Sequence, residues 1–526
     1  MQCSWRPQYT TRDSNESKPT SHHIMNILNH HESPLPITED LLLSPPDQPF
    51  VPDTPRIVRG ALKAVNSAVE VITSVGGCAL LDLAERYFGT SQYDGDKARV
   101  QRVSEIIVVI IEHLKRALEE NGLGASAING APHIYDGSYW VRIEENQCQG
   151  MLSWLAEFLG HSAAHSRFYL FREQLLKQLL SALWLNIPDA DDDTALVNLR
   201  NGTLEITLDQ TNLRKFSRDD LLTYQLPFDF DDCAVCPIFD RFLLRVLPDE
   251  SSRLVLAEFF GWVFLRGLKL EKILVLFGDG FNGKSVLYDI INALFGSENV
   301  SHMGFGSLNK IENRFWLGEA LLNFSSEISG NCDPDLFKKL ASGEPVEARR
   351  LFKDVFFMRR YARMACNTNV LPTNTEQTKG FFRRFLIIPF TVTIPEDEAD
   401  PDLARKIIDS ELPGVFNWVM SGLNRLRANR RFSECEASDT ALASYRKESD
   451  SVALFLDDEC WVHSPNSKIA KSEIYKEYRI YCITSGHKAL SKSNFGKRLL
   501  RQHNVGECKT DGIRFWNLRR NACEES

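Results

Sequence analysis

The fold of the central part of this chain is decided by the stretch Ile273-Leu-Val-Leu-Phe-Gly-Asp-Gly-Phe-Asn-Gly-Lys-Ser285. Its apolar beginning predicts a buried strand, and the apolar pattern that follows Ser285 predicts a helix. Between them, residues 278–285 match G-x-x-x-x-G-K-[ST], the pattern of a loop that surrounds the phosphates of a nucleoside triphosphate. The alternative is a glycine turn that matches by chance, which the flanking strand and helix disfavour. We therefore predict a nucleotide-binding loop made of Gly278, Asp279, Gly280, Phe281, Asn282, Gly283, Lys284, Ser285 and Val286.

The residue types in this loop suit phosphate chemistry. Glycines let successive backbone N–H groups point at phosphate oxygens, and the N-terminus of the following helix adds a favourable dipole. We expect Lys284 to neutralise charge on the β- and γ-phosphates and Ser285 to give a hydroxyl ligand to Mg²⁺. The expected cofactors are accordingly ATP and Mg²⁺.

Two further strands follow along the chain, and the βα alternation to about residue 420 predicts a parallel sheet flanked by helices. The first strand ends at Ser326-Glu327, where a carboxylate could hold Mg²⁺ or polarise the attacking water. A glutamate that caps a helix is the alternative. The second contains Asn367 and Asn369, and an amide at a strand end can position that water. Asparagine is also a common turn residue.

Two adjacent arginines, Arg383 and Arg384, follow a pair of phenylalanines and precede another apolar strand. A guanidinium held on a rigid element is suited to reach the phosphate of a neighbouring subunit. The alternative is a pair of surface cations.

Composition sets the general class of the chain. Its 526 residues suggest three or four domains, and 43% hydrophobic and 25% charged residues are typical of a soluble globular protein. A net charge of −9 argues against a uniformly basic coat for nucleic acid. The longest apolar run is too short to span a membrane, and the first thirty residues lack the apolar stretch of a signal peptide. We expect a cytoplasmic protein with no membrane partner and, because Cys233 and Cys236 lack a second pair, no zinc site.

The rest of the chain divides by composition. Residues 1–60 are rich in proline and polar residues and predict a disordered tail. Residues 61–260 predict a mainly helical domain with a hairpin turn at Asp136-Gly137. Residues 425–450 are polar and predict a connector, and residues 451–520 form a small final unit.

The final unit is basic although the chain as a whole is acidic. Between Lys468 and Arg520 the sequence holds thirteen basic and four acidic residues. A helix at residues 491–502, with Ser491 as N-cap, and a hairpin at residues 505–518 predict a winged helix that binds DNA. The expected contacts are Lys492, Lys497 and Arg498. A basic module that docks on another protein is the alternative.

The order of these parts resembles that of the superfamily 3 helicases, and more narrowly the C-terminal helicase part of phage, plasmid and poxvirus primase-helicases. The resemblance extends over roughly residues 130–520. It includes the phosphate loop, Ser326-Glu327, the segment from Lys338 to Lys353, Asn369-Val-Leu-Pro372 and Arg383-Arg384, and upstream Asn198-Leu-Arg-Asn-Gly202 and Cys236-Pro-Ile-Phe-Asp240. The residues ahead of it are too few for the primase domain of many relatives, so we predict no primer synthesis.

The resemblance implies an AAA+-like P-loop core at residues 261–425, preceded by a mainly helical domain at 61–260 and followed by a winged helix at 451–520. It implies a ring, commonly a hexamer, that hydrolyses ATP, moves along one DNA strand and unwinds forks, with a separate primase as a possible partner. By matching position, Glu327 is the Walker B carboxylate and Mg²⁺ ligand. Asn369 fits the sensor pattern Asn-x-x-Pro better than Asn367. The remaining implied roles are the arginine finger across the subunit interface, Arg384 or Arg383, and the DNA-contacting hairpin, Arg349, Arg350 and Lys353.

One departure from the family pattern concerns hydrolysis. Many members carry two acidic residues at the Walker B position, and here Ser326 occupies the first. This favours, as an alternative, an ATP-regulated origin-binding initiator or loader with weak or no unwinding. A third hypothesis is a P-loop kinase that phosphorylates a small molecule. The basic final unit and the paired arginines disfavour it.

Overall fold

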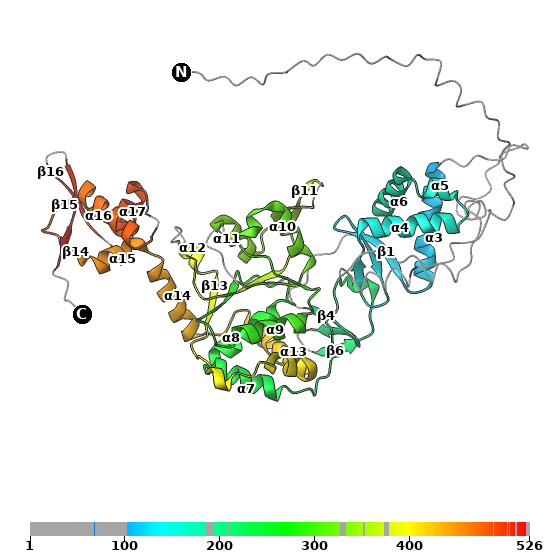
Figure 1. The fold of residues 1–526 in the computed structure, drawn as a ribbon, viewed down its shortest axis with the longest axis horizontal. Helices are drawn as coiled ribbons and strands as arrows, with labels where there is room; N and C mark the ends of the chain where they lie inside the picture. The colour runs from blue at the N-terminus through cyan, green and yellow to red at the C-terminus, as the bar shows by residue number, and fades with distance from the viewer. Residues whose placement is uncertain are drawn as a thin grey trace, which may run out of the picture.

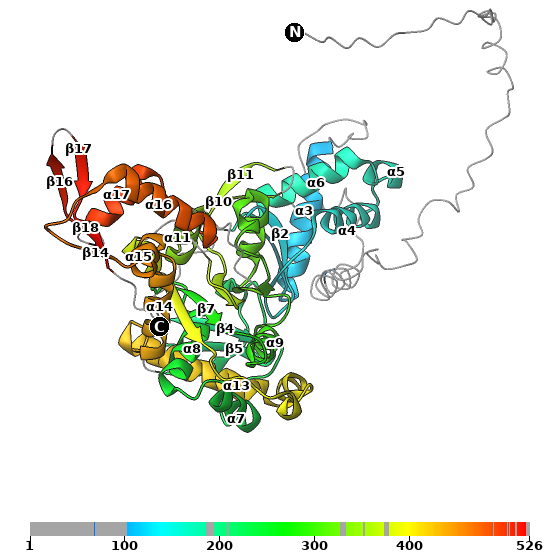
Figure 2. The ribbon, with the colours of Figure 1, turned by 60° about the vertical axis from the view of Figure 1, so that its left-hand side comes forward.

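The computed structural model describes residue 68 and residues 103–185, 194–207, 210–326, 333–350, 353–372, 378–487, 489–501, 503, 505–510 and 513–521. The predicted disordered tail at residues 1–60 lies outside the described residues. Three units follow one another along the chain, and the first and last lie on opposite sides of the central one in both views (Figures 1 and 2).

The N-terminal unit combines helices with two small antiparallel sheets. The hairpin predicted at Asp136-Gly137 is confirmed, because Tyr135 pairs with Trp140 across it. In the described part of the region predicted to be mainly helical, six short strands lie among the helices. Strands such as Gly-Ala-Ser-Ala-Ile carry few β-branched or aromatic residues, so their sequence gives a weak signal. The elements are α3 (Val103–Glu120), β1 (Gly124–Ile128), β2 (Ala131–Tyr135), β3 (Trp140–Arg142), α4 (Glu145–Phe158), α5 (Ala163–Ser166), α6 (Tyr169–Ala182), β4 (Ala195–Leu199), β5 (Gly202–Ile206), β6 (Thr211–Arg214) and the 3₁₀ turn η2 (Arg218–Asp220).

A five-stranded sheet forms the central unit, in the order β13-β7-β12-β9-β8, and its paired strands run parallel. The predicted parallel α/β sheet is thus confirmed. Cys366 of β12 aligns with Val275 of β7 and with Ser325 of β9, so these strands end at one edge of the sheet. The strands are β7 (Ile273–Phe277), β8 (Val300–Ser301), β9 (Leu322–Ser325), β12 (Arg363–Thr368) and β13 (Phe385–Pro389).

Helices cover both faces of this sheet, which explains why its strands are continuously apolar. Leu274 and Leu276 share a core with α7 (Pro237–Val246), α8 (Glu250–Trp262), α9 (Lys284–Phe295) and α13 (Leu403–Asn429). Ile273 and Val275 face the opposite way, into a core with α11 (Pro334–Ser342), α12 (Lys379–Phe382) and α14 (Glu436–Glu448). The predicted connector at residues 425–450 is therefore largely a packed helix, since Tyr445 of α14 is buried in this second core.

Smaller elements complete the central unit. A two-stranded antiparallel hairpin joins Val346 to Met358. The remaining elements are η3 (Ser307–Asn309), α10 (Ile311–Arg314), η4 (Phe315–Glu319), β10 (Val346–Arg349), β11 (Val355–Met358) and η5 (Glu396–Glu398).

The C-terminal unit contains the helix and the hairpin that were predicted from its sequence. The predicted helix begins at Lys492, where the Ser491 hydroxyl accepts a hydrogen bond from the Asn494 amide at 3.3 Å. The predicted hairpin is present as an antiparallel pair of strands. The elements are α15 (Ser451–Asp458), β14 (Trp461–His463), β15 (Ile469–Ala470), α16 (Lys471–Thr484), α17 (Lys492–Arg501), β16 (Glu507–Thr510), β17 (Ile513–Trp516) and β18 (Leu518–Arg520).

Candidate functional site

The predicted phosphate loop connects the end of β7 to the start of α9, and two of its glycines are sterically required. Gly278 has a φ of 153°, and a Cβ atom there would lie 2.3 Å from the carbonyl oxygen of Phe390. Gly283 has a φ of 84°, and a Cβ atom there would lie 2.7 Å from Val246. L-residues with side chains rarely adopt such φ values, and space is lacking as well. The loop conformation therefore depends on glycine at both positions.

Lys284 lies folded across this loop and is 6% exposed. Its ammonium group donates hydrogen bonds to the carbonyl oxygen of Asp279 at 2.7 Å and to Oδ1 of Asn282 at 3.0 Å, and another to the carbonyl oxygen of Gly278. Burial lowers the pKa of Lys284, and the charge of Asp279 opposes this effect. The acceptors of this desolvated ammonium group are weak and neutral. A phosphate oxygen in their place would stabilise its charge strongly.

Asn282 fixes the other side of the loop. Its side chain is 4% exposed and donates to the carbonyl oxygen of Phe390 at 3.1 Å. By contrast, Phe281 at the loop tip is 76% exposed, and the Ser285 side chain is exposed at the first turn of α9. The Ser285 hydroxyl is thus accessible to a metal ion bound beside the loop.

A cavity of about 680 Å³ lies at the same edge of the sheet. Phe277 and Pro389 contribute the strand ends, Leu371 follows β12, and one face of α14 forms the opposite wall. Small-molecule sites commonly have 300–1,000 Å³ and mainly apolar walls with a few polar groups. This cavity has room for the part of a nucleotide that the phosphate loop does not hold. The α14 residues that line it are Glu436, Ala437, Thr440, Ala441, Ser444, Tyr445 and Glu448.

The strand ends beside the loop bring together only part of the predicted catalytic set. Ser326 is exposed directly after β9, whereas Glu327 lies outside the described residues. Asn369 is exposed beyond the end of β12. Asn367 lies within β12, in register with Leu276 of the strand that leads into the loop. Its buried Oδ1 atom has no hydrogen-bond partner among the described residues, so Asn367 is a second candidate for positioning water.

The two arginines predicted to act across a subunit interface have different surroundings. Arg384 is 9% exposed, and its guanidinium donates to the Ser342 hydroxyl at 2.9 Å within the same chain. The Arg383 side chain is 60% exposed and forms an ion pair with Glu271. Both residues precede β13 and so lie at the edge of the sheet opposite the phosphate loop. Neither side chain is therefore placed beside a nucleotide held by its own loop.

The basic residues of the β10–β11 hairpin are held by carboxylates. Arg349 pairs with Glu312 of the same unit. Arg350 and Lys353 both pair with Glu145, at 3.0 and 3.2 Å, and Glu145 begins α4 of the N-terminal unit. Sequence reasoning missed this contact because about two hundred residues separate the partners and no local pattern signals it.

The predicted DNA-contacting residues of α17 differ in how exposed their side chains are. Lys492 and Lys497 are exposed. Arg498 is turned inward and forms an ion pair with Asp450 at 3.3 Å, and His503 also contacts that carboxylate, at 3.2 Å. Burial by itself would raise the pKa of Asp450, but the hydrogen bond from His503 and the charge of Arg498 hold it below its usual value. Arg498 thus contributes to the packing of the C-terminal unit.

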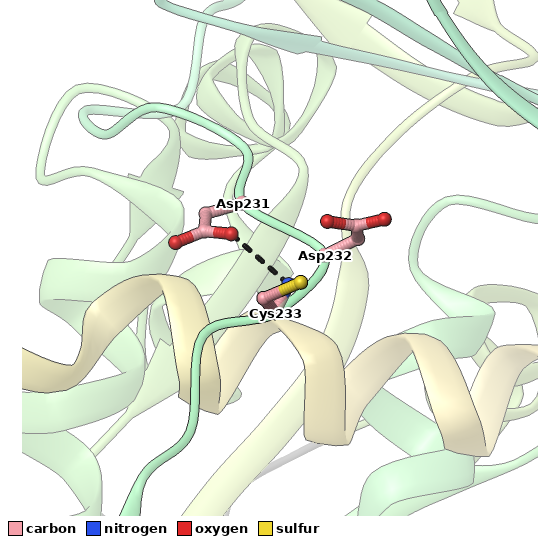
Figure 3. Close-up of side chains that lie close together, drawn as sticks. All are labelled: Asp231, Asp232 and Cys233. Carbon is pink, nitrogen blue, oxygen red and sulfur yellow. Dashed lines mark hydrogen bonds between the residues drawn. The ribbon is translucent and has the colours of Figure 1, made fainter.

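An exposed group of three side chains, Asp231, Asp232 and Cys233, lies close enough together to share a cation (Figure 3). Its geometry is that of a local turn, because Asp231 Oδ1 accepts a hydrogen bond from the Cys233 amide at 3.0 Å. Cys236 is not part of this group and is buried, with its sulfur 3.6 Å from Asp240.

Three family models match separate segments of the chain. Residues 112–248 match a model described as D5 N terminal like, residues 276–384 match a family of unknown function, DUF5906, and residues 447–522 match a model described as Poxvirus D5 protein-like.

One curated relative is the putative helicase L207/L206 of Acanthamoeba polyphaga mimivirus. It is 22% identical over 251 residues, which cover 44% of this chain and 25% of that protein. The chain thus spans about a quarter of the length of this relative.

Among the solved structures that the comparison found are two of the apo C-terminal region of NrS-1. They are 12% and 11% identical to this chain, with a TM-score of 0.43 for each, and they cover 77% of this chain and 98% of theirs. In the part of the chain that the structure describes, no helix is long and apolar enough to cross a membrane. Because two of the three matching models are of the D5 type, the comparisons support the predicted likeness to primase-helicases.

Proposed function

We propose that this chain is an ATP-dependent, Mg²⁺-dependent DNA helicase of superfamily 3. It would unwind duplex DNA during the replication of a virus, phage, plasmid or other mobile element. The observation that carries the proposal is the desolvated Lys284 ammonium group in a glycine-dependent loop, at the C-terminal edge of a parallel sheet. Ligands of open parallel sheets bind at this edge. The helicase name of the mimivirus relative and the two D5-type matches support the proposal.

In this proposal, different residues of the chain bind the phosphates, bind Mg²⁺ and position the attacking water. The loop amides and Lys284 hold the phosphates, and Ser285 with Glu327 would hold Mg²⁺, which screens charge on the phosphates when bound. Asn369 or Asn367 orients the attacking water. Arg383, or Arg384 after it is released from Ser342, reaches the nucleotide of the adjacent subunit, so the active form is a ring, which we expect to be a hexamer.

DNA contacts would come from the central hairpin and the C-terminal unit. Arg349, Arg350 and Lys353 would track one strand through the ring, while Lys492 and Lys497 would bind the backbone of the fork as part of a winged helix. The decisive experiment is strand displacement from a forked duplex with ATP and Mg²⁺. Unwinding that depends on ATP supports the proposal, and unwinding without ATP, or no nucleotide-dependent action on DNA, contradicts it.

The second candidate is an ATP-regulated origin-binding initiator or loader, and the exposed Ser326 in place of a Walker B acid favours it. The two candidates differ in one measurement. An initiator would show ATP hydrolysis stimulated by DNA but no strand displacement, whereas a helicase would show both.

The contact of Glu145 with the hairpin leads to a prediction that depends on the proposed function. The Glu145 carboxylate occupies the cations that a DNA phosphate would use, so the Glu145→Gln variant is expected to bind single-stranded DNA about three- to tenfold more tightly at low salt. Its affinity should also fall more steeply with salt, because two more cations are available to release counterions. Fluorescence anisotropy with a labelled oligonucleotide measures both quantities.

A matched control for this prediction is Glu173→Gln in the same unit. Glu173 of α6 forms an exposed ion pair with Lys177 of the same helix, at 3.6 Å. We expect its DNA affinity to equal that of the unmodified chain. Equal affinities for all three proteins would show that Arg350 and Lys353 are not DNA ligands.

A further inference from the structure

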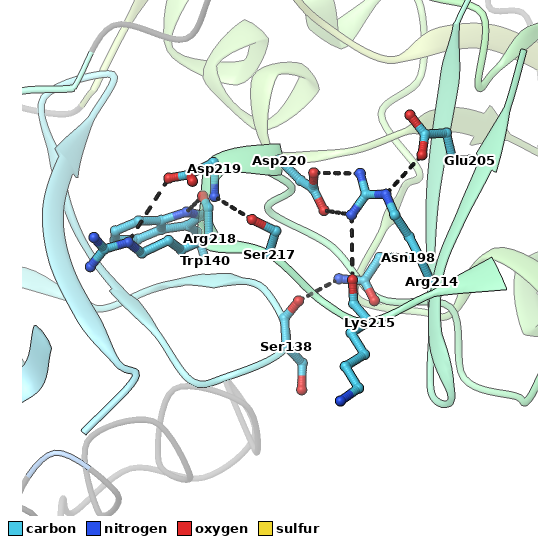
Figure 4. Close-up of polar contacts among 10 residues, drawn as sticks. All are labelled: Ser138, Trp140, Asn198, Glu205, Arg214, Lys215, Ser217, Arg218, Asp219 and Asp220. Atoms are coloured by element: carbon cyan, nitrogen blue, oxygen red, sulfur yellow. Dashed lines mark hydrogen bonds and ion pairs between the residues drawn. The ribbon is translucent and has the colours of Figure 1, made fainter. Parts of the chain in front are cut away.

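A second cavity, of about 390 Å³, lies where the N-terminal unit meets the central unit. Its walls come from β1–β3, from the segment between η2 and Tyr224, from the end of α8, and from residues 318–321 ahead of β9. Figure 4 shows part of this wall, the segment that carries Asp219 and Asp220. The volume is within the range of small-molecule sites.

Several positively charged side chains converge on this cavity. Arg142, Arg266 and Arg360 line it. The imidazole of His133 also lines it but is neutral, because burial lowers its pKa to about 4. Arg363 lies just behind Arg266, because its guanidinium donates to the carbonyl oxygen of Leu265 at 3.1 Å and stacks on Trp262. Burial and the nearby charge of Arg266 lower the pKa of Arg363 to about 9. Like charges this close destabilise one another unless an anion lies between them.

Most carboxylates at the cavity are already engaged by other cations. Glu319 pairs with Arg142 at 3.3 Å. Asp220 accepts two hydrogen bonds from Arg214, at 2.7 and 2.9 Å (Figure 4). Asp219 lies 3.9 Å from Arg218, and its side chain is 90% exposed.

Arg266 differs from Arg142 and Arg214, which pair with carboxylates. Among the described residues, no carboxylate forms an ion pair with its guanidinium and no side-chain hydrogen bond involves it. Arg266 is exposed and lines this open cavity. Burial lowers the pKa of Arg266, the nearby Tyr224 opposes this effect, and the charge of Arg360 lowers the pKa further. The nearby charge of Arg360 disfavours a second cation here, and no carboxylate of the described residues forms an ion pair with Arg266 to offset that repulsion.

We propose that this cavity binds a small phosphate-bearing ligand, a nucleoside phosphate or free pyrophosphate, with Arg266 and Arg360 as the anion-binding residues. Guanidinium groups form planar, bidentate hydrogen bonds that suit phosphate oxygens. The hydroxyl groups of Thr194 and Thr223 also line the cavity and can donate to such a ligand.

The proposed site is separate from the phosphate loop. Glu319, Ala320 and Leu321 of its wall come before β9, whereas the loop follows the end of β7. Because β7, β9 and β12 run parallel, the two sites lie at opposite edges of the sheet. A ligand here would contact the N-terminal and central units at once and stabilise their arrangement.

The test uses the full chain with Lys284→Ala, which disables the phosphate loop. Calorimetric titration with pyrophosphate and with ADP is expected to detect one remaining site in this background. Adding Arg266→Gln should weaken binding at that site by about tenfold or more, since a charged hydrogen bond is lost. Tighter binding of ADP than of pyrophosphate identifies a nucleotide as the ligand, and equal binding identifies the phosphate group alone.

A control and a stability measurement separate a ligand role from a structural one. Arg405→Gln changes an arginine that is 71% exposed at the start of α13, and it should leave binding unchanged. Without ligand, the Arg266→Gln protein should melt at the same temperature as the unmodified chain or higher, because repulsion among the arginines is relieved. Absence of binding in the Lys284→Ala background, equal affinity with and without Arg266, or a lowered melting temperature of Arg266→Gln without ligand would each overturn the proposal.

Discussion

The Lys284→Ala variant is expected to hydrolyse ATP at least about a hundredfold more slowly than the unmodified chain and to bind it about tenfold or more weakly. The ammonium group is the one cation within the loop, and it is desolvated before any nucleotide arrives. Removing a preorganised donor of this kind typically costs two to three orders of magnitude in rate. Steady-state phosphate release and calorimetric titration with a slowly hydrolysed ATP analogue measure the two effects.

Two comparisons show whether the loss is specific to the loop. Lys269 is an exposed lysine in the segment ahead of β7, so Lys269→Ala should keep full activity. The hydrogen bonds that Lys284 makes in the free chain all go to groups of its own loop, so melting of Lys284→Ala should change little. Full ATPase activity in Lys284→Ala would exclude the loop as the nucleotide site and with it the helicase proposal.

The elements predicted correctly from sequence are those whose signal is local. The strand and helix around the phosphate loop, the hairpin at Asp136-Gly137 and the helix that starts after Ser491 each depend on residues close together in the chain. Glycine positions, N-caps and apolar periodicity report such structure directly. The parallel sheet followed from the order of these elements.

What could not be predicted depends on contacts between distant residues. The basic character of Arg384 and Arg498 suggested surface roles, but Ser342 and Asp450 hold both side chains within the fold. The contact of Glu145 with Arg350 and the cavity at Arg266 both arise where two units meet. Amino-acid types show that a charge exists, whereas only the folded chain shows which charge already has a partner. The roles of Asn369, Arg383 and the loop remain predictions for experiment.

The second large effect is expected from Gly422, where α13 crosses α8. A Cβ atom at Gly422 would lie 2.3 Å from the backbone carbon of Ala257 and 2.4 Å from its oxygen. On the other helix, a Cβ atom at Gly261 would lie 2.6 Å from the backbone nitrogen of Leu423. The two helices thus approach each other through two glycines, and backbone atoms cannot move aside as a flexible side chain can. This crossing supports one face of the sheet that carries the phosphate loop.

Gly422→Ala is expected to destabilise the chain by about 3 kcal/mol, the upper end for an overpacked core, although alanine favours helix formation. A change of this size corresponds to a melting temperature lower by about 6–12 °C for a unit of this length. Circular dichroism during heating measures it. The matched control is Gly304→Ala, because a Cβ atom there meets nothing within 4 Å and its φ is not positive. A Gly422→Ala protein that melts together with Gly304→Ala would show that the helices have room to separate, and that the crossing does not fix the sheet beneath it.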